Sequence, residues 1–133
     1  MSNQSFTISL VVPVYNEEES IDTFIETIDK ELAPLRDQLQ IVFVNDGSRD
    51  KTREVVEKAI ERDNRVSLIN LARNFGKEAA MTAGLAHARG DAVIPMDVDL
   101  QDPPALVLEF VRLWREEGYD TVYGVRTDRN ADT

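Results

Sequence analysis

Three aspartates lie close together in the segment "PMDVDLQDPP" (95–104): Asp97, Asp99 and Asp102. The segment begins in an apolar run, "AVIPM", whose composition is typical of a buried strand. Neighbouring carboxylates repel one another, and burial adds to the cost of their charge. A hard divalent cation relieves that repulsion, and Mg²⁺ or Mn²⁺ held by one or two carboxylates normally also takes phosphate oxygens from a substrate. Asp97 and Asp99 therefore form a candidate metal site.

The same region also has structural explanations. A D-x-D pair occurs by chance in many acidic chains, so the motif alone does not establish a metal site. Asp102 precedes two prolines and is well placed as the N-cap of a following helix. Asp46, in "NDGS", is typical of a turn, and Gly47 fits the same turn. Both explanations stay open on these residues alone.

Two cations, Arg73 and Lys77, flank the segment "NFG". They are either ordinary solvated charges or the groups that neutralise a diphosphate at the start of the next helix. Glycine-rich phosphate loops are excluded, because "PVYNEEES" contains no glycine and no G-x-x-x-x-G-K-[ST] segment exists. His87, the only histidine, is expected to be a structural or surface residue.

The composition limits the classes of partner. The chain has 133 residues, with 15 basic and 25 acidic side chains and a formal net charge of −10. This acidity argues against a nucleic-acid partner bound through a broad basic surface. The chain has no cysteine, so neither a disulfide framework nor a thiolate metal site is expected. No segment approaches the roughly 18 apolar residues that span a bilayer, so we expect this chain by itself to be soluble.

Five short apolar runs, rich in β-branched residues, predict strands. Most of them are continuous rather than alternating, which is typical of strands buried on both faces of a parallel sheet. The runs are "TISLVVP" (7–13), "QIVFVN" (40–45), "VSLINL" (66–71), "AVIPM" (92–96) and "DTVYGV" (120–125).

Segments of helical period separate these runs. They are "NEEESIDTFIETIDKEL" (16–32), "SRDKTREVVEKAIERD" (48–63), "GKEAAMTAGLAHARG" (76–90) and "DPPALVLEFVRLWREEG" (102–118). We expect N-caps at Asn16, Ser48 and Asp102. The third segment is rich in small residues, which allows close packing on a sheet. Strand and helix alternate, so the expected fold class is α/β, with a mostly parallel sheet and helices on both faces.

Polar residues follow every predicted strand. The segments are "VYNEEE", "NDGSRD", "ARNFGKE", "DVDLQDPP" and "RTDR", in chain order. Solvation alone explains any one polar loop. In an open parallel sheet, however, ligands bind beyond the carboxyl ends of the strands, so these loops meet at one edge. Their recurrence there favours a binding site.

No repeat, linker or low-complexity tract divides the chain. The polar tail "RTDRNADT" starts no further element, so we expect residues 1–133 to be part of a larger domain that is truncated at its C-terminus. The oligomeric state stays open on the sequence; surface left uncovered at such a point would promote self-association, so a homo-oligomer is one of the states considered.

Taken together, the loops resemble those of the GT-A glycosyltransferases of family 2. Within that family the chain is most similar to the polyprenyl-phosphate sugar transferases, the branch of bactoprenol glucosyltransferases and dolichol-phosphate mannosyltransferases. The resemblance runs in order through "VVPVYNEEESI", "IVFVNDGSRDKT", "LARNFGKEAAMTAGLAHARGDAVIPMDVDLQDPP" and "YGVRTDR". It implies the Rossmann-like, nucleotide-sugar-binding half of a GT-A fold. Where many family members read "DDGS", this chain has Asn45 before Asp46.

The resemblance implies an inverting hexosyltransferase that moves a sugar, expected to be glucose, from a nucleoside-diphosphate sugar to a polyprenyl phosphate. UDP-glucose is the expected donor and GDP-mannose the second choice, with Mg²⁺ or Mn²⁺ as the cofactor. The parent protein is expected to act at the cytoplasmic side of a membrane. The truncated chain is expected to bind donor nucleotide but to transfer sugar poorly or not at all.

The resemblance also implies roles for single residues. The nucleotide-binding residues would be Pro13, Tyr15, Asn16, Glu17, Asp46, Gly47, Arg73, Lys77 and Val98. Within this set Glu17 would lie towards the ribose and Asp46 at the edge of the base, while Gly47 and Ser48 would shape their loop. Arg73 and Lys77 would lie near the diphosphate.

The metal and the acceptor have their own implied residues. Asp97 and Asp99 would hold the metal, with Gln101 close to it. Arg126 and Arg129 would bind the acceptor phosphate. By the same resemblance the catalytic residues are Asp97, Asp99 and Arg126.

Two other classes remain as alternatives. A metal-dependent sugar nucleotidyltransferase would also need carboxylates and a cation, but such enzymes usually have a glycine-rich first loop. A non-catalytic nucleotide-binding or receiver-like module fits the size, but a receiver would carry its acidic pair after the first strand. The products separate the classes: pyrophosphate for the first alternative, none for the second, and nucleoside diphosphate for a glycosyltransferase.

Overall fold

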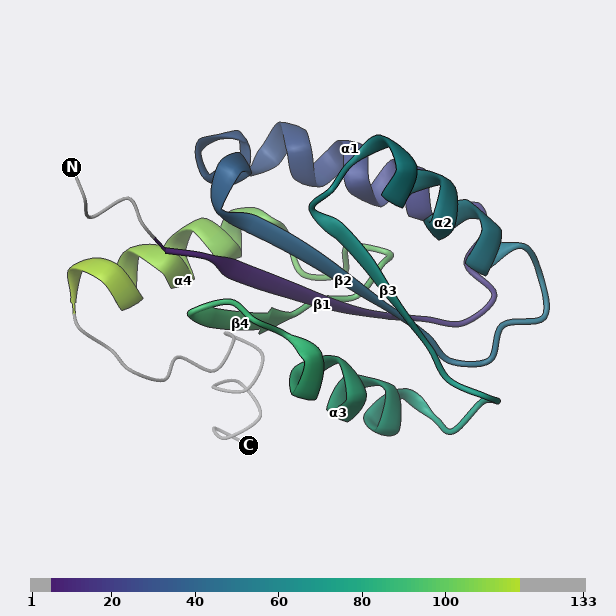
Figure 1. Cartoon of the computed structure of the whole chain (residues 1–133). Coiled ribbons are helices and arrows are strands. Elements are labelled where there is room, and N and C mark those ends of the chain that lie inside the picture. The colour runs from purple at the N-terminus through teal and green to yellow at the C-terminus, as the bar shows by residue number, and fades with distance from the viewer. Residues whose placement is uncertain (1–5, 118–133) are drawn as a thin grey trace.

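The computed structural model describes residues 6–117, in which strands and helices alternate. The elements are β1 (Ile8–Val14), α1 (Ile21–Glu31), the 3₁₀ helix η2 (Ala33–Gln38), β2 (Leu39–Asn45), α2 (Thr52–Arg62), β3 (Val66–Asn70), α3 (Lys77–His87), β4 (Ala92–Pro95) and α4 (Ala105–Glu116) (Figure 1). The strand predicted over 120–125 lies outside the described residues. None of the helices within 6–117 is long and apolar enough to cross a membrane.

The four strands form one parallel sheet in the order β3-β2-β1-β4. In the centre, Ile8 of β1 pairs with Leu39 of β2 on one side and with Ala92 of β4 on the other. The chain order reverses at β1, and such a switch point opens a crevice beyond the carboxyl ends of the strands, where ligands bind. The predicted α/β class is confirmed.

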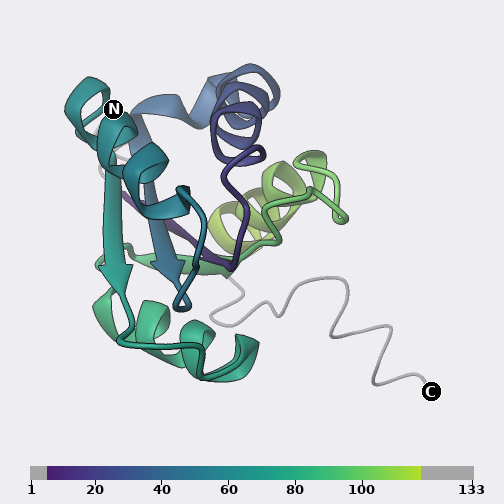
Figure 2. The ribbon, with the colours of Figure 1, turned by 90° about the vertical axis from the view of Figure 1, so that its right-hand side faces the viewer.

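Helices cover both faces of the sheet. α1, α2 and α4 pack on one face and α3 on the other (Figures 1 and 2). Side chains of β1 alternate between the two layers: Leu10 and Val12 join the larger core, and Val11 joins the core under α3. The apolar run of β1 is continuous because both of its faces are buried, as predicted.

α3 lies close to the sheet because its inward face consists of small residues. Ala80 is fully buried. A Cβ atom at Gly84 would lie 2.3 Å from Cγ1 of Val11 and 2.9 Å from Cγ2 of Val44. The predicted close packing is confirmed, and it fixes the position of the helix that begins with Lys77.

The three predicted N-caps are wrong. The N-cap residues are Ser20 for α1, Lys51 for α2 and Pro104 for α4, so each helix begins later than its sequence pattern indicated. Asn16 and Ser48 bond to each other's loops instead: the N–H of Asn16 donates to Oγ of Ser48 at 2.9 Å. The side chains of Asn16 and Ser48, which the sequence pattern placed at helix N-termini, therefore bond to a neighbouring loop instead.

Replacing Gly84 with alanine should destabilise the protein by about 1–2 kcal/mol: the 2.3 Å contact puts the overpacking cost at about 2–3 kcal/mol, the upper part of its usual range, and helix propensity returns about 1 kcal/mol. The side chains that the new methyl group meets are stiff valines in the sheet. Urea unfolding followed by circular dichroism measures the change. Ala86→Gln, on the exposed face of the same helix, is the control. Equal stability of Gly84→Ala and the wild type would contradict the close approach.

Candidate nucleotide-binding site

The loops that follow the strands surround a cavity of about 380 Å³ at the carboxyl edge of the sheet. It is lined by Pro13, Val14, Tyr15, Glu17, Asp46, Asn74, Gly76, Lys77, Asp97, Val98, Asp99 and Gln101. All four described strands contribute through the loop that follows them. The sequence predicted this convergence from the repeated polar loops.

Most of the predicted site residues line this cavity, and three of the exceptions lie elsewhere in the described part of the chain. Neither Asn16 nor Gly47 lines the cavity. Asn16 bonds to the loop after β2, and Gly47 lies against the backbone of the loop after β3. Arg73 is exposed, and its guanidinium carbon lies 4.8 Å from the centre of the Phe75 ring. Arg126 and Arg129 lie outside the described residues. The roles of all these residues stay predictions.

The acidic end of the cavity follows β4. The Asp97 side chain is only 13% exposed, and its Oδ1 lies 2.5 Å from Nζ of Lys77, whose side chain is 64% exposed. The side-chain amide of Gln101 donates to Oδ2 of Asp99 at 3.1 Å. The N–H of Leu100 donates to the carbonyl of Asp97 at 3.0 Å, which closes a tight turn. This turn brings both carboxylates to the same end of the cavity.

Two strained residues flank the site. Asn16 and Leu100 have positive φ angles of 54° and 59°, a conformation that residues other than glycine rarely adopt; asparagine tolerates it better than most, so the strain is greater at Leu100. Asn16 lies between Tyr15 and Glu17 in sequence, and Leu100 directly follows Asp99. Such strained conformations persist only where the surrounding structure holds them in place, and they are most frequent at functional sites.

The acidic end suits a hard cation that shares its coordination with a ligand. Asp97, Asp99 and Gln101 offer oxygen donors, which Mg²⁺ and Mn²⁺ prefer. Among residues 6–117, no three histidine, cysteine, aspartate or glutamate side chains are arranged to hold a metal ion. Two carboxylates fit a cation that takes the rest of its coordination from phosphate oxygens and water.

Asp46 is nearly buried, with 4% exposure, and holds the loop in front of α3. Its Oδ1 accepts the N–H of Phe75 at 2.8 Å, and its Oδ2 accepts the N–H of Gly76 at 3.1 Å. The sequence predicted Asp46 at the edge of the base and did not predict this bonding. The carboxylate therefore has a structural function in the site, whatever else it contacts.

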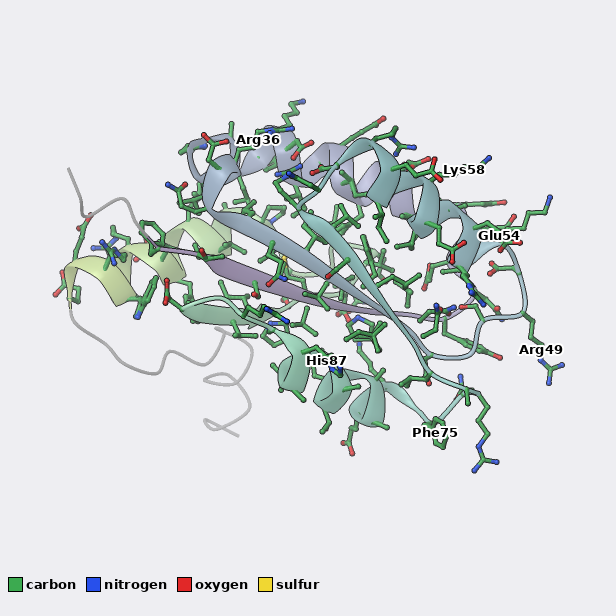
Figure 3. All side chains as sticks on the ribbon, in the orientation of Figure 1. Arg36, Arg49, Glu54, Lys58, Phe75 and His87 are labelled. Atoms are coloured by element: carbon green, nitrogen blue, oxygen red, sulfur yellow. The ribbon has the colours of Figure 1, made fainter. Side chains whose placement is uncertain are left out.

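Gly47 allows the loops after β2 and β3 to touch backbone to backbone. Its φ is 74°, and a Cβ atom there would lie 2.3 Å from the backbone nitrogen of Asn74 and 2.4 Å from the carbonyl carbon of Arg73. Only glycine fits such a position without displacing a backbone. Phe75 extends into solvent from the far end of this loop, with 51% exposure (Figure 3).

The loops after β1 and β2 are joined by hydrogen bonds. The N–H of Glu17 donates to Oγ1 of Thr52 at 2.8 Å, and the N–H of Glu18 donates to Oδ2 of Asp50 at 3.2 Å. The N–H of Lys51 donates in turn to Oε1 of Glu18 at 2.8 Å. These bonds fix Glu17 on the cavity wall.

Sequence reasoning missed Val14, Asn74 and Gly76, which also line the cavity. Asn74 and Gly76 lie between the two cations that it did select, so their place in "RNFGK" was a usable signal. Val14 is the last residue of β1 and had no polar signal. His87 is exposed on α3, with Nδ1 2.9 Å from the carbonyl of Ala83, which confirms a surface residue (Figure 3).

The fold and the position of the site define a class. A mannosyltransferase from Pyrobaculum calidifontis, solved with GDP-Man and Mn²⁺, is similar to 75% of this chain, with a TM-score of 0.63 and 27% identity over 34% of its own chain. TarS from S. aureus, residues 1–349 with UDP-GlcNAc, is similar to 77% of this chain, with a TM-score of 0.61 and 29% identity over 31% of its own. The chain therefore has the fold of the GT-A glycosyltransferases.

Sequence comparison identifies the family. The model of glycosyl transferase family 2 matches residues 9–133, and the chain belongs to that family. A bactoprenol glucosyl transferase of Shigella phage SfV is 48% identical over 127 residues, which cover 94% of this chain and 40% of that protein. An uncharacterized glycosyltransferase of Synechocystis sp. is 45% identical over 126 residues, 95% of this chain and 39% of that protein. The chain thus spans about 40% of the length of the curated relatives it matches.

Replacing Asp46 with asparagine should destabilise the protein by about 1–3 kcal/mol, because the amide group turns a donor towards a partly buried backbone N–H that loses its acceptor. Denaturant unfolding at neutral pH measures the loss. Asp91→Asn is a matched control, since Asp91 is exposed and accepts one backbone N–H, from Thr7. The control should change stability by less than about 0.5 kcal/mol. Equal effects of the two substitutions would contradict the anchoring role of Asp46.

Asp50 makes the joined loops sensitive to acid. Burial raises the pKa of the Asp50 carboxyl, but hydrogen bonds from the hydroxyl and N–H of Thr52 and from the N–H of Glu18 outweigh it, so the pKa lies below its ordinary value. A carboxyl with a lowered folded pKa contributes stability above its unfolded pKa, and this contribution disappears as the pH falls through the folded pKa.

Asp50→Asn should therefore lower the free energy of unfolding at neutral pH, and the difference from the wild type should shrink as the pH falls below 3.8, the ordinary pKa of an aspartate. Urea unfolding across this pH range provides the measurement. Asp37→Asn, at an exposed position of η2, serves as the control. A difference that stays constant with pH would show that the charge of Asp50 does not matter.

Proposed function

We propose that the protein is a glycosyltransferase whose residues 6–117 form the site for a nucleoside-diphosphate sugar. One observation carries this proposal: a single cavity at the switch point of the sheet brings Asp97, Asp99 and Lys77 together with Tyr15 and Glu17. The first three suit a diphosphate and its cation, and the last two suit a nucleoside. Its relatives among glycosyltransferases, at 45–48% identity, support the same conclusion.

The nucleoside would lie against the loop after β1. Tyr15 is 41% exposed and offers an aromatic face at the rim of the cavity. The Glu17 carboxylate is an acceptor for ribose hydroxyl groups, and the bond from its N–H to Thr52 holds its backbone in place. The diphosphate would then point towards Lys77, Asp97 and Asp99.

The cavity carries excess negative charge, so an anionic diphosphate would need a cation to bind there. Among residues 6–117, four carboxylates line it, those of Glu17, Asp46, Asp97 and Asp99, against the single ammonium of Lys77. An anionic diphosphate cannot enter such a site favourably unless positive charge is added. Asp97 and Asp99 would hold Mg²⁺ or Mn²⁺, with Gln101 beside them. When bound, this cation would stabilise the negative charge that develops on the leaving nucleoside diphosphate.

The chain's own residues would mainly position the reactants. We propose that an oxygen of a polyprenyl phosphate attacks the anomeric carbon from the face opposite the leaving group, so that the configuration is inverted. Because that oxygen is already anionic, it needs little help from a general base. Orientation and fixed charges would then supply most of the acceleration. Arg126 and Arg129, outside the described residues, are proposed to bind the acceptor phosphate.

UDP-glucose is the proposed donor, and GDP-mannose is the second choice. Similarity to the bactoprenol glucosyl transferase of Shigella phage SfV supports glucose as the transferred sugar. Similarity to the mannosyltransferase solved with GDP-Man supports the second choice. The proposed acceptor implies that the parent protein works at the cytoplasmic side of a membrane.

Isothermal titration of the chain with UDP-glucose, UDP and GDP tests the donor site. With Mn²⁺ present, UDP species should bind at least about tenfold more tightly than with a chelator, a difference of about 1.4 kcal/mol. GDP should bind more weakly than UDP. In a variant with both Asp97→Ala and Asp99→Ala, the part of the affinity that depends on metal should disappear, because the cation loses its protein ligands.

The matched control carries Asp37→Asn and Glu61→Gln, which remove the same charge at exposed positions on η2 and α2, outside the cavity. It should keep the metal-dependent affinity of the wild type. Equal binding of UDP in Mn²⁺ and in chelator, or an unchanged affinity in the Asp97 and Asp99 variant, would contradict the proposed site.

A further inference from the structure

Lys77 and Asp97 form an ion pair in which the lysine side chain is much more exposed to solvent than the aspartate side chain. Nζ of Lys77 lies 2.5 Å from Oδ1 of Asp97. The Asp97 side chain is 13% exposed and follows the end of β4, whereas the Lys77 side chain is 64% exposed. The carboxylate is thus the fixed member, and the lysine reaches it from solvent on a flexible stem.

The backbone of Lys77 is anchored. Lys77 is the first residue of α3, and the preceding loop is tied to Asp46 through the N–H groups of Phe75 and Gly76. The N–H of Ala80 donates to the carbonyl of Gly76 at 3.0 Å, and Gly84 holds the helix against the sheet. Any movement of the ammonium group away from Asp97 therefore takes place in the four-carbon side chain.

The Lys77 ammonium group is bonded to Oδ1 of Asp97, an oxygen that a divalent cation held by Asp97 and Asp99 would also use. An ammonium hydrogen bond and a metal bond compete for the same carboxylate oxygen, and the positive charge of Lys77 also repels a second cation. A diphosphate beside Lys77 carries more negative charge than one carboxylate and would draw the ammonium towards itself. That movement would leave Oδ1 of Asp97 to the metal.

We propose that Lys77 couples the binding of the divalent cation to the binding of the nucleotide, by blocking Asp97 until a diphosphate arrives. The inference rests on the proposed donor site. Linkage makes the effect reciprocal: the nucleotide raises the affinity for the metal, and the metal raises the affinity for the nucleotide by the same factor. The site thus favours a metal–nucleotide pair over metal alone.

Mn²⁺ affinity is the readout, measured on the 133-residue chain by the electron paramagnetic resonance signal of free Mn²⁺, with and without saturating UDP. Lys77→Gln should bind Mn²⁺ alone about five- to tenfold more tightly than the wild type, because the competing ammonium is gone. With UDP bound the two proteins should bind Mn²⁺ with nearly equal affinity, since Lys77 has then left Asp97. The enhancement by UDP should fall by the same five- to tenfold factor.

Lys51→Gln is the matched control, because it removes the same charge at an exposed position at the start of α2, outside the cavity lining. It should leave the Mn²⁺ affinity within about twofold of the wild type, since salt at about 0.15 M screens distant charges. Thermal unfolding verifies that both variants fold.

Two failures are distinguishable. If the wild type binds Mn²⁺ more tightly in the presence of UDP but Lys77→Gln binds Mn²⁺ alone no more tightly than the wild type does, the coupling role of Lys77 is overturned and the donor site stands. If UDP does not affect Mn²⁺ binding in the wild type, or no Mn²⁺ binds, the donor site itself is overturned together with the coupling.

Discussion

The architecture of the site depends on the bonds that Asp46 makes across the gap between two loops. A parallel sheet brings the ends of its strands to one edge, but it does not decide where the loops beyond that edge will point. The nearly buried carboxylate of Asp46 fixes the N–H groups of Phe75 and Gly76, and so sets the start of α3 and the position of Lys77. Gly47 permits the contact, because any side chain there would meet the backbone of Asn74.

The second constraint is charge. From the described part of the chain, the cavity gathers four carboxylates and one ammonium on separate loops. In a protein with a formal net charge of −10, such a cavity would repel an anionic ligand unless a cation joined it. The ion pair of Lys77 and Asp97 partly satisfies this need within the chain, and it does so with a side chain that is able to move. The same contact that relieves repulsion at Asp97 thereby becomes a means of controlling what binds there.

Membership of glycosyl transferase family 2 gives these features a common explanation. The described residues hold loops suited to a nucleotide, a diphosphate and a cation, and the strained backbone at Asn16 and Leu100 lies among them. The rigid part is built by small-residue packing of α3 and by hydrogen bonds between loops. Lys77 extends from this frame on a long, exposed side chain to reach Asp97.

The sequence by itself determined the parallel α/β sheet, because continuous apolar runs such as β1 are stable only when both faces are buried. It also indicated the close approach of α3 and, because polar loops recur at strand ends, a site at that edge of the sheet; the resemblance to family 2 glycosyltransferases added most of the individual residues that line the cavity. Only the tertiary structure decided the helix starts, the bonds of Asp46 and the pairing of Lys77 with Asp97. The bonds of Asp46 and the pair of Lys77 with Asp97 join residues 20 or more positions apart, whereas periodicity and capping patterns report only on near neighbours in the chain.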